Sequence, residues 1–258
     1  MRCTKAIRGW LMATTAAVVV ALPLPSPAQT NNVDPDAIAL LRRATDYFAG
    51  MHQFSLVADT TIEIVNDSGQ KLQLDHLVSI DLQRPNRLRV ERVGDLVNQT
   101  FYYDGKSLAV NLPEERYYAS TPVPATLDAM LDFVRNQLDL IAPGSDLLYT
   151  DSYQRLAAGL TAGYIIGKSE AGGVQCDHLA FRNNQVDWQI WIQEGDQPVP
   201  RKLVVTSKRF AQAPEFAFTI SRWNPAPSFS NATFQFVPPE GSRKIEFRPA
   251  TLSGKAQQ

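Results

Sequence analysis

Residues 176–192 read Cys-Asp-His-Leu-Ala-Phe-Arg-Asn-Asn-Gln-Val-Asp-Trp-Gln-Ile-Trp-Ile, two runs of alternating apolar and polar residues around Asn183-Asn184. Asparagine tolerates the positive φ that both central residues of a type I′ turn need. The pattern therefore predicts a β-hairpin with a two-residue loop, in which Arg182 pairs with Gln185. Because side chains alternate across a strand, such a hairpin has two unlike faces.

The two faces of this predicted hairpin differ sharply in chemistry. The apolar face consists of Leu179, Phe181, Trp188, Ile190 and Ile192. The opposite face consists of Cys176, His178, Arg182, Asp187, Gln189 and Trp191. The first face requires a hydrophobic partner, whereas the second holds the side chains that are able to bind a metal or another protein.

The same two-residue period recurs along most of the chain. It predicts further strands within 53–64, 72–82, 87–93, 97–103, 108–112, 117–118, 160–168, 202–209, 215–223 and 233–237. Apolar residues at helical spacing predict helices over 35–49 and 127–141, with further helical turns within 146–156. After Pro238-Pro239 we expect a loose polar tail.

These elements define a mainly β fold with about ten or eleven strands and two or three helices. Short strands joined by tight turns indicate antiparallel pairing. A sheet of that size curls, and few helices are available to cover its concave side. We therefore predict a curved antiparallel half-barrel that holds its helices in a concave mouth.

The first residues have the character of a secretory signal peptide. Arg2, Lys5 and Arg8 precede an apolar run over 10–22, and Ser26-Pro27-Ala28 offers small residues for cleavage after Ala28. The run is shorter than the roughly 20 residues of a spanning helix. We expect a signal peptide over 1–28, a single domain over 29–258, a periplasmic location and no stable membrane insertion after signal removal.

The charge balance of the mature chain argues against nucleic acid as a partner. Residues 1–28 hold three of the 25 basic residues and none of the 26 acidic ones, which leaves a net charge of about −4. No cluster of basic residues is present to follow a phosphate backbone. Cys176 is the one cysteine beyond the signal, and a lone thiol of this kind is typically buried.

Several short motifs identify a family. They are Arg84-Pro85-Asn86-Arg87-Leu88-Arg89, Tyr103-Asp104-Gly105-Lys106-Ser107-Leu108, Cys176-Asp177-His178-Leu179-Ala180-Phe181, Asp187-Trp188-Gln189-Ile190-Trp191-Ile192, Pro198-Val199-Pro200-Arg201-Lys202 and Phe236-Val237-Pro238-Pro239. With them the chain resembles the exported bacterial proteins grouped as domain of unknown function 2092. That family is similar to the periplasmic carriers of the LolA and LolB type, so the resemblance implies a LolA-like half-barrel.

The polar face of the hairpin has two interpretations. Cys176 and His178 would lie on one face with Asp187, which gives a minor hypothesis of metal binding. The alternative is a cross-strand polar cluster in which His178 packs against Trp191. We expect a partner surface formed by Cys176, His178, Asp187 and Trp191, with no bound metal.

Neither a catalytic motif nor a cofactor motif is present, so we expect a protein that is not an enzyme and has no cofactor.

The leading hypothesis is binding of a hydrophobic small molecule, lipid or lipoprotein acyl chain, since each buried methylene contributes roughly 0.8 kcal/mol. The alternative is an envelope scaffold or assembly protein that binds another envelope protein through its outer face. For the concave side, the alternative to a ligand cavity is that the same apolar residues pack together as a filled hydrophobic core. The candidate lining residues are Phe54, Leu56, Ile62, Leu74, Ile80, Leu88, Val90, Phe101, Met130, Leu131, Val134, Leu179, Phe181, Trp188, Ile190, Phe216 and Phe218.

Overall fold

A computed structural model describes residues 32–95, 97–138, 140 and 142–247 of the chain. All of these residues belong to one compact unit, Asn31–Gln258. The expected signal peptide over 1–28 lies outside the described residues. Among the described residues, none of the helices combines the length and the apolar character needed to cross a membrane.

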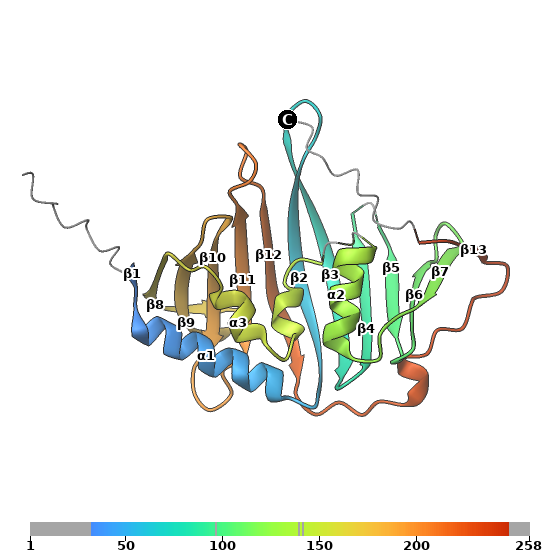
Figure 1. Ribbon diagram of the computed structural model, residues 1–258, viewed down its shortest axis with the longest axis horizontal. Helices are drawn as coiled ribbons and strands as arrows, with labels where there is room; N and C mark the ends of the chain where they lie inside the picture. Colours follow the sequence, from blue (N-terminus) through green and yellow to red (C-terminus); the bar gives the residue numbers. More distant parts are fainter. Residues whose placement is uncertain (1–31, 96, 139, 141, 248–258) are drawn as a thin grey trace, which may run out of the picture. The chain divides into compact units, whose positions relative to one another are not determined.

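The described residues form one open curved sheet of 13 strands (Figure 1). The strands are β1 (Asn32–Val33), β2 (Gln53–Val65), β3 (Lys71–Gln83), β4 (Arg87–Gly94), β5 (Gln99–Tyr103), β6 (Ser107–Leu112), β7 (Tyr117–Pro122), β8 (Ala162–Ala171), β9 (Val174–Arg182), β10 (Val186–Gln193), β11 (Pro200–Ser207), β12 (Glu215–Asn224) and β13 (Arg243–Ile245). Their order in the sheet is β1-β8-β9-β10-β11-β12-β2-β3-β4-β5-β6-β7-β13. Only the two-residue β1 and the three-residue β13 at the ends pair in parallel. The predicted mainly β curved antiparallel sheet is confirmed, with more strands than expected because these two edge strands were not foreseen.

Helices lie against one face of this sheet, which we call the inner face (Figure 1). They are α1 (Pro35–Gly50), α2 (Leu127–Gln137) and α3 (Ser152–Ala157), with short 3₁₀ turns at η1 (Ser145–Leu148) and η2 (Asn231–Thr233). Asp34 caps α1, since its side chain accepts a hydrogen bond from the backbone N of Asp36 at 2.8 Å, and Pro35 occupies the first turn. The second helix ends at Gln137, four residues earlier than the sequence predicts.

The main hydrophobic core lies between the inner face and the helices. Leu41 and Phe48 of α1 and Met130 of α2 are buried in it together with Phe54 and Ile190 of the sheet. Helix α1 contacts β8, β10 and β11, whereas α2 lies in front of β3 and β4 (Figure 1). The concave side is therefore filled by side chains wherever these helices cover it.

The hairpin of β9 and β10 has the predicted faces but a different turn. Arg182 pairs with Asp187, not with Gln185, so the connection is longer than two residues. Oδ1 of Asn183 accepts hydrogen bonds from the backbone N atoms of Gln185 and Val186, at 2.8 and 2.9 Å. This side-chain turn replaces the predicted type I′ turn, and neither asparagine has a positive φ. The register shifts by two residues, which leaves each side chain on its predicted face.

The C-terminal segment differs from the prediction of a strand over 233–237 and a loose tail. Residues 231–233 form η2, and the chain then lies over Tyr102 and Tyr118 on the outer face of the sheet before it reaches β13, which pairs with β7. Phe234 is buried, and the ring of Phe236 lies against Tyr102 and Tyr118 at centroid distances of 5.5 and 5.4 Å. The aromatic alternation thus reflects packing onto the sheet and not strand pairing. We call residues 231–239 the outer strap.

Candidate functional site

The structure divides the predicted lining residues into two groups by their burial. One group is buried in the main core: Phe54, Leu56, Leu88, Met130, Leu131, Leu179, Phe181, Trp188 and Ile190. The other group is only partly buried: Ile62, Leu74, Ile80, Val90, Phe101, Val134, Phe216 and Phe218. The first group belongs to the packed core, so the accessible part of the predicted lining is formed by the second.

The most open part of the inner face is the far end of the β2–β3 hairpin. Strand β12 pairs with β2 only as far as Ile62, and β4 pairs with β3 only as far as His76, so the tip projects beyond both neighbours (Figure 1). Ile64 and Leu72 face each other on this tip and are 39% and 37% exposed. These two side chains continue the apolar inner face onto the tip.

This exposed surface continues across β12. Phe216 pairs with Ile62, and the rings of Phe216 and Phe218 lie 6.2 Å apart between centroids. A Cβ atom added to Gly144 would lie 3.4 Å from both rings, so the chain that follows α2 borders them. We call this surface the hairpin strip; it consists of Ile62, Ile64, Leu72, Leu74, Phe216 and Phe218.

A polar cluster lies on the inner face at the base of the hairpin strip. His76 is buried, and Arg92 on the neighbouring strand places Nη2 2.8 Å from its Nε2. The same Nε2 lies 3.0 Å from the carbonyl oxygen of Asp95. Burial lowers the pKa of the Arg92 guanidinium, because desolvation disfavours its charged form. The sequence analysis did not single out Arg92.

The polar face of β9 and β10 forms a packed cluster on the outer face of the sheet. His178 stacks on Trp191, whose Nε1 donates a hydrogen bond to Oγ of Ser169 at 2.8 Å. Cys176 is fully buried beside Trp191. Two members of the predicted partner surface, Cys176 and Trp191, are therefore covered; His178 and Asp187 are not fully buried, and a partner there stays a prediction.

The minor metal hypothesis finds no support in the arrangement of this cluster. Burial raises the pKa of the Cys176 thiol to about 11, which disfavours the thiolate that ligates metals. His178 uses Nε2 to contact Oε1 of Gln189 at 2.9 Å. Across the described part of the chain, no group of three or more His, Cys, Asp or Glu side chains is placed to hold a metal ion.

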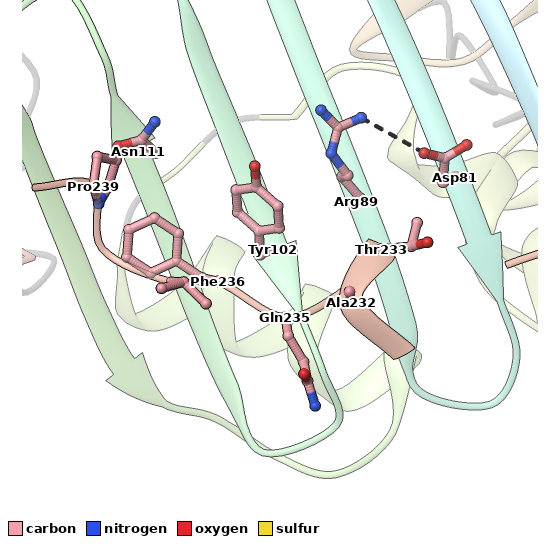
Figure 2. A pocket seen from close by; sticks show the side chains of 10 residues that line it. Asp81, Arg89, Tyr102, Asn111, Ala232, Thr233, Gln235, Phe236 and Pro239 are labelled. Carbon is pink, nitrogen blue, oxygen red and sulfur yellow. Dashed lines mark ion pairs between the residues drawn. The ribbon is translucent and has the colours of Figure 1, made fainter. Parts of the chain in front are cut away.

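A hollow lies on the outer face, where the outer strap crosses β3 to β6 (Figure 2). It has a volume of about 450 Å³ and is lined by Asp81, Arg89, Tyr102, Asn111, Ala232, Thr233, Gln235, Phe236, Val237 and Pro239. Arg89 lies 2.8 Å from Glu91 and 3.6 Å from Asp81, so its charge is already balanced. Burial raises the pKa of Asp81 despite the nearby Arg89. The sequence analysis missed this hollow because it predicted a strand over 233–237.

The fold and the two faces define a class: an open curved antiparallel sheet with helices on its inner face and an apolar strip at the projecting hairpin. The chain belongs to the family of predicted periplasmic proteins described as DUF2092, whose model matches residues 37–248. The predicted family and the periplasmic location are thereby confirmed.

Several solved structures are similar to this chain at low identity. Lipoprotein LppX of Mycobacterium tuberculosis is 14% identical, with 76% of this chain and 98% of LppX covered and a TM-score of 0.47. MucB in the MucA/MucB complex of Pseudomonas aeruginosa is 13% identical, with coverages of 78% and 61% and a TM-score of 0.45. A LolA superfamily protein from Nitrosomonas europaea is 9% identical, with coverages of 78% and 97% and a TM-score of 0.39. A search of the curated proteins gave no match.

Proposed function

We propose that this periplasmic protein binds the apolar part of a lipid-like molecule on the hairpin strip and performs no catalysis. The observation that carries the proposal is the exposure of Ile64 and Leu72 on the inner face of a hairpin that projects beyond its neighbouring strands. The opposite face of the same hairpin carries polar side chains, including the Lys71–Glu63 ion pair. Leu77 and Val93 are exposed on that opposite face, but the inner face offers the larger apolar contact, the six side chains of the hairpin strip.

The strip, together with the inner face of β3 as far as Val78, is long enough for an extended apolar ligand. Leu72 and Val78 lie six residues apart on β3, which corresponds to about 20 Å of extended strand. A chain laid along this length is flanked by Phe216 and Phe218 of β12 on one side. Each methylene removed from water there contributes roughly 0.8 kcal/mol, so an acyl chain gains affinity without directional chemistry.

The nucleophile and base that the sequence offers are unsuited to hydrolysis. The Cys176 thiol is buried and its pKa is raised to about 11 by burial. His178 is stacked on Trp191, and its Nε2 is occupied by Gln189. These contacts support a binding protein in preference to an enzyme.

The test is uptake of a fluorescent fatty-acid probe by the purified protein, together with native mass spectrometry of protein isolated from the periplasm. The Ile64→Asp variant places a charge on the strip and should abolish uptake. Leu77→Asp is the matched control, because Leu77 lies on the same hairpin, is 41% exposed and faces the opposite side. A ligand-free native mass together with no probe uptake by the unmodified protein would overturn the proposal.

A further inference from the structure

Arg92 occupies an unusual place on the inner face. It pairs with Val78 on β3 and with Gln99 on β5, and its neighbour on the same face of β4 is Val90. Its Nε atom is buried and has no hydrogen-bond partner among the described residues. An apolar surface thus contains one guanidinium whose donors exceed the acceptors around it.

The contact with His76 does not resolve this excess. Nε2 of His76 lies 2.8 Å from Nη2 of Arg92 and 3.0 Å from the carbonyl oxygen of Asp95. If Nε2 of His76 carries the ring proton, it donates to the carbonyl oxygen of Asp95 and cannot accept from Arg92. If Nε2 carries no proton, it accepts from Arg92 and cannot donate to Asp95. In the first case Nδ1 of His76, 3.4 Å from Nη2 of Arg92, can accept instead, but neither tautomer gives Nε of Arg92 an acceptor.

Other arginines of the sheet are better matched. Arg182 forms a two-donor pair with Asp187, and Arg89 contacts both Asp81 and Glu91. Arg84 also has buried nitrogens without partners, but the charge of Asp128 opposes the effect of burial on its pKa. For Arg92, among the described residues, no acidic side chain lies within ion-pair distance. An anion would supply the acceptor that Nε of Arg92 lacks and would offset its charge.

We propose that Arg92 binds the carboxylate of a long-chain fatty acid whose tail lies along the hairpin strip, an inference that rests on the proposed function. Nε and a terminal nitrogen form one edge of the guanidinium, which matches the two oxygens of a carboxylate. One guanidinium beside a histidine balances a single negative charge, which favours a monoanion. Along β3 the order Val78, His76, Leu74, Leu72 leads from the headgroup position onto the strip.

The experiment compares oleic acid with oleyl alcohol, which shares its chain and lacks the charge, by titration calorimetry on the intact mature protein. Charged hydrogen bonds of this type are lost on Arg92→Met, so oleate should bind roughly 10- to 100-fold more weakly while the alcohol binds as before. Arg92→Lys keeps the charge without the two-donor edge, so its affinity for oleate should lie between those of the unmodified protein and Arg92→Met. Arg222→Met is the control, because Arg222 is an exposed arginine on the outer face.

Each outcome of this experiment decides a different statement. If the unmodified protein binds neither compound, the proposed function itself is wrong. If it binds both and Arg92→Met changes neither, the strip binds acyl chains and only the role of Arg92 is overturned. Tighter binding of oleoyl lysophosphatidic acid than of oleate overturns the choice of carboxylate. Thermal unfolding of Arg92→Met checks its fold, and we expect no loss of stability because an unpaired buried charge has been removed.

Discussion

His178 of β9 stacks on Trp191 of β10, with ring centroids 3.8 Å apart and planes inclined by 15°. The two residues are directly opposed in the antiparallel pairing of these strands. The Nζ atom of Lys202 lies 4.6 Å from the centroid of the Trp191 ring. This arrangement covers Trp191 from the outer face and places the imidazole ring in a partly buried site next to a cation.

The His178 site predicts a specific pH dependence of stability. Burial lowers the pKa of His178, with Gln189 opposing and Lys202 reinforcing the shift. As the pH falls through the ordinary value of 6.5, the unfolded chain takes up this proton before the folded one, so stability decreases and then levels off below the folded-state pKa. Thermal unfolding at pH 7.5 and 5.5 should show a smaller loss for His178→Gln than for the unmodified protein.

The control for that measurement is His52→Gln, which replaces an exposed histidine outside the cluster. Its loss of stability between the two pH values should match that of the unmodified protein. Equal losses in all three proteins would contradict the role assigned to His178.

Gly94 is required where β3 and β4 begin to pair. A Cβ atom at this position would lie 2.2 Å from the carbonyl oxygen of Asp75 and 2.7 Å from Cα of His76, both backbone atoms. Gly94→Ala must therefore separate the two strands locally, and we expect a loss of about 1–3 kcal/mol in urea unfolding. Gly50→Ala is the control, because nothing lies within 4 Å of its added Cβ. An unchanged unfolding midpoint for Gly94→Ala would contradict this account.

The hairpin shows which part of the fold is readable in the sequence. The faces of Phe181 and Trp188 follow from alternation alone, so the sequence predicted them correctly. The turn was wrong because asparagine supports two solutions: positive φ in a tight turn, or a side-chain hydrogen bond to the backbone ahead. Asn183 forms the side-chain hydrogen bonds to the backbone, and the local sequence does not distinguish between the two kinds of turn.

The candidate site could be predicted only in part from the sequence, because the exposure of its residues depends on which elements cover each strand. Leu56 and Ile64 have the same alternating surroundings on β2, but Leu56 is buried in the main core and Ile64 extends past the neighbouring strands. That difference is set by the lengths of β12 and β4, which are distant in sequence. Arg92 was missed since one basic residue in an alternating run has no distinctive signal until its neighbours are known.

Tyr103 links the sheet to the segment before α2. Its ring is fully buried, and its Oη donates a hydrogen bond to the carbonyl oxygen of Pro124 at 2.8 Å. Burial, with the charge of Asp104, raises the pKa of Tyr103 to about 12, so the hydroxyl stays protonated as a donor. Tyr103→Phe leaves the Pro124 oxygen without this donor and should lower the free energy of unfolding by about 1–3 kcal/mol.

The comparison for Tyr103 is Tyr117→Phe, which removes the hydroxyl of a tyrosine that is 36% exposed. Urea unfolding of this control should remain within about 0.5 kcal/mol of the unmodified protein. If both variants behave alike, the hydrogen bond to Pro124 contributes nothing measurable.

The outer strap is held to the sheet by Phe234. This residue is 1% exposed, and its ring makes an edge contact with Phe229 at a centroid distance of 5.1 Å. Phe234→Ala removes a buried aromatic ring, so we expect a loss of about 3–5 kcal/mol and faster proteolysis within the strap. Val237→Ala truncates a strap residue that is 79% exposed and should leave stability within about 0.5 kcal/mol. Equal urea midpoints for the two variants would show that the strap is not packed onto the sheet, because only a buried ring makes them differ.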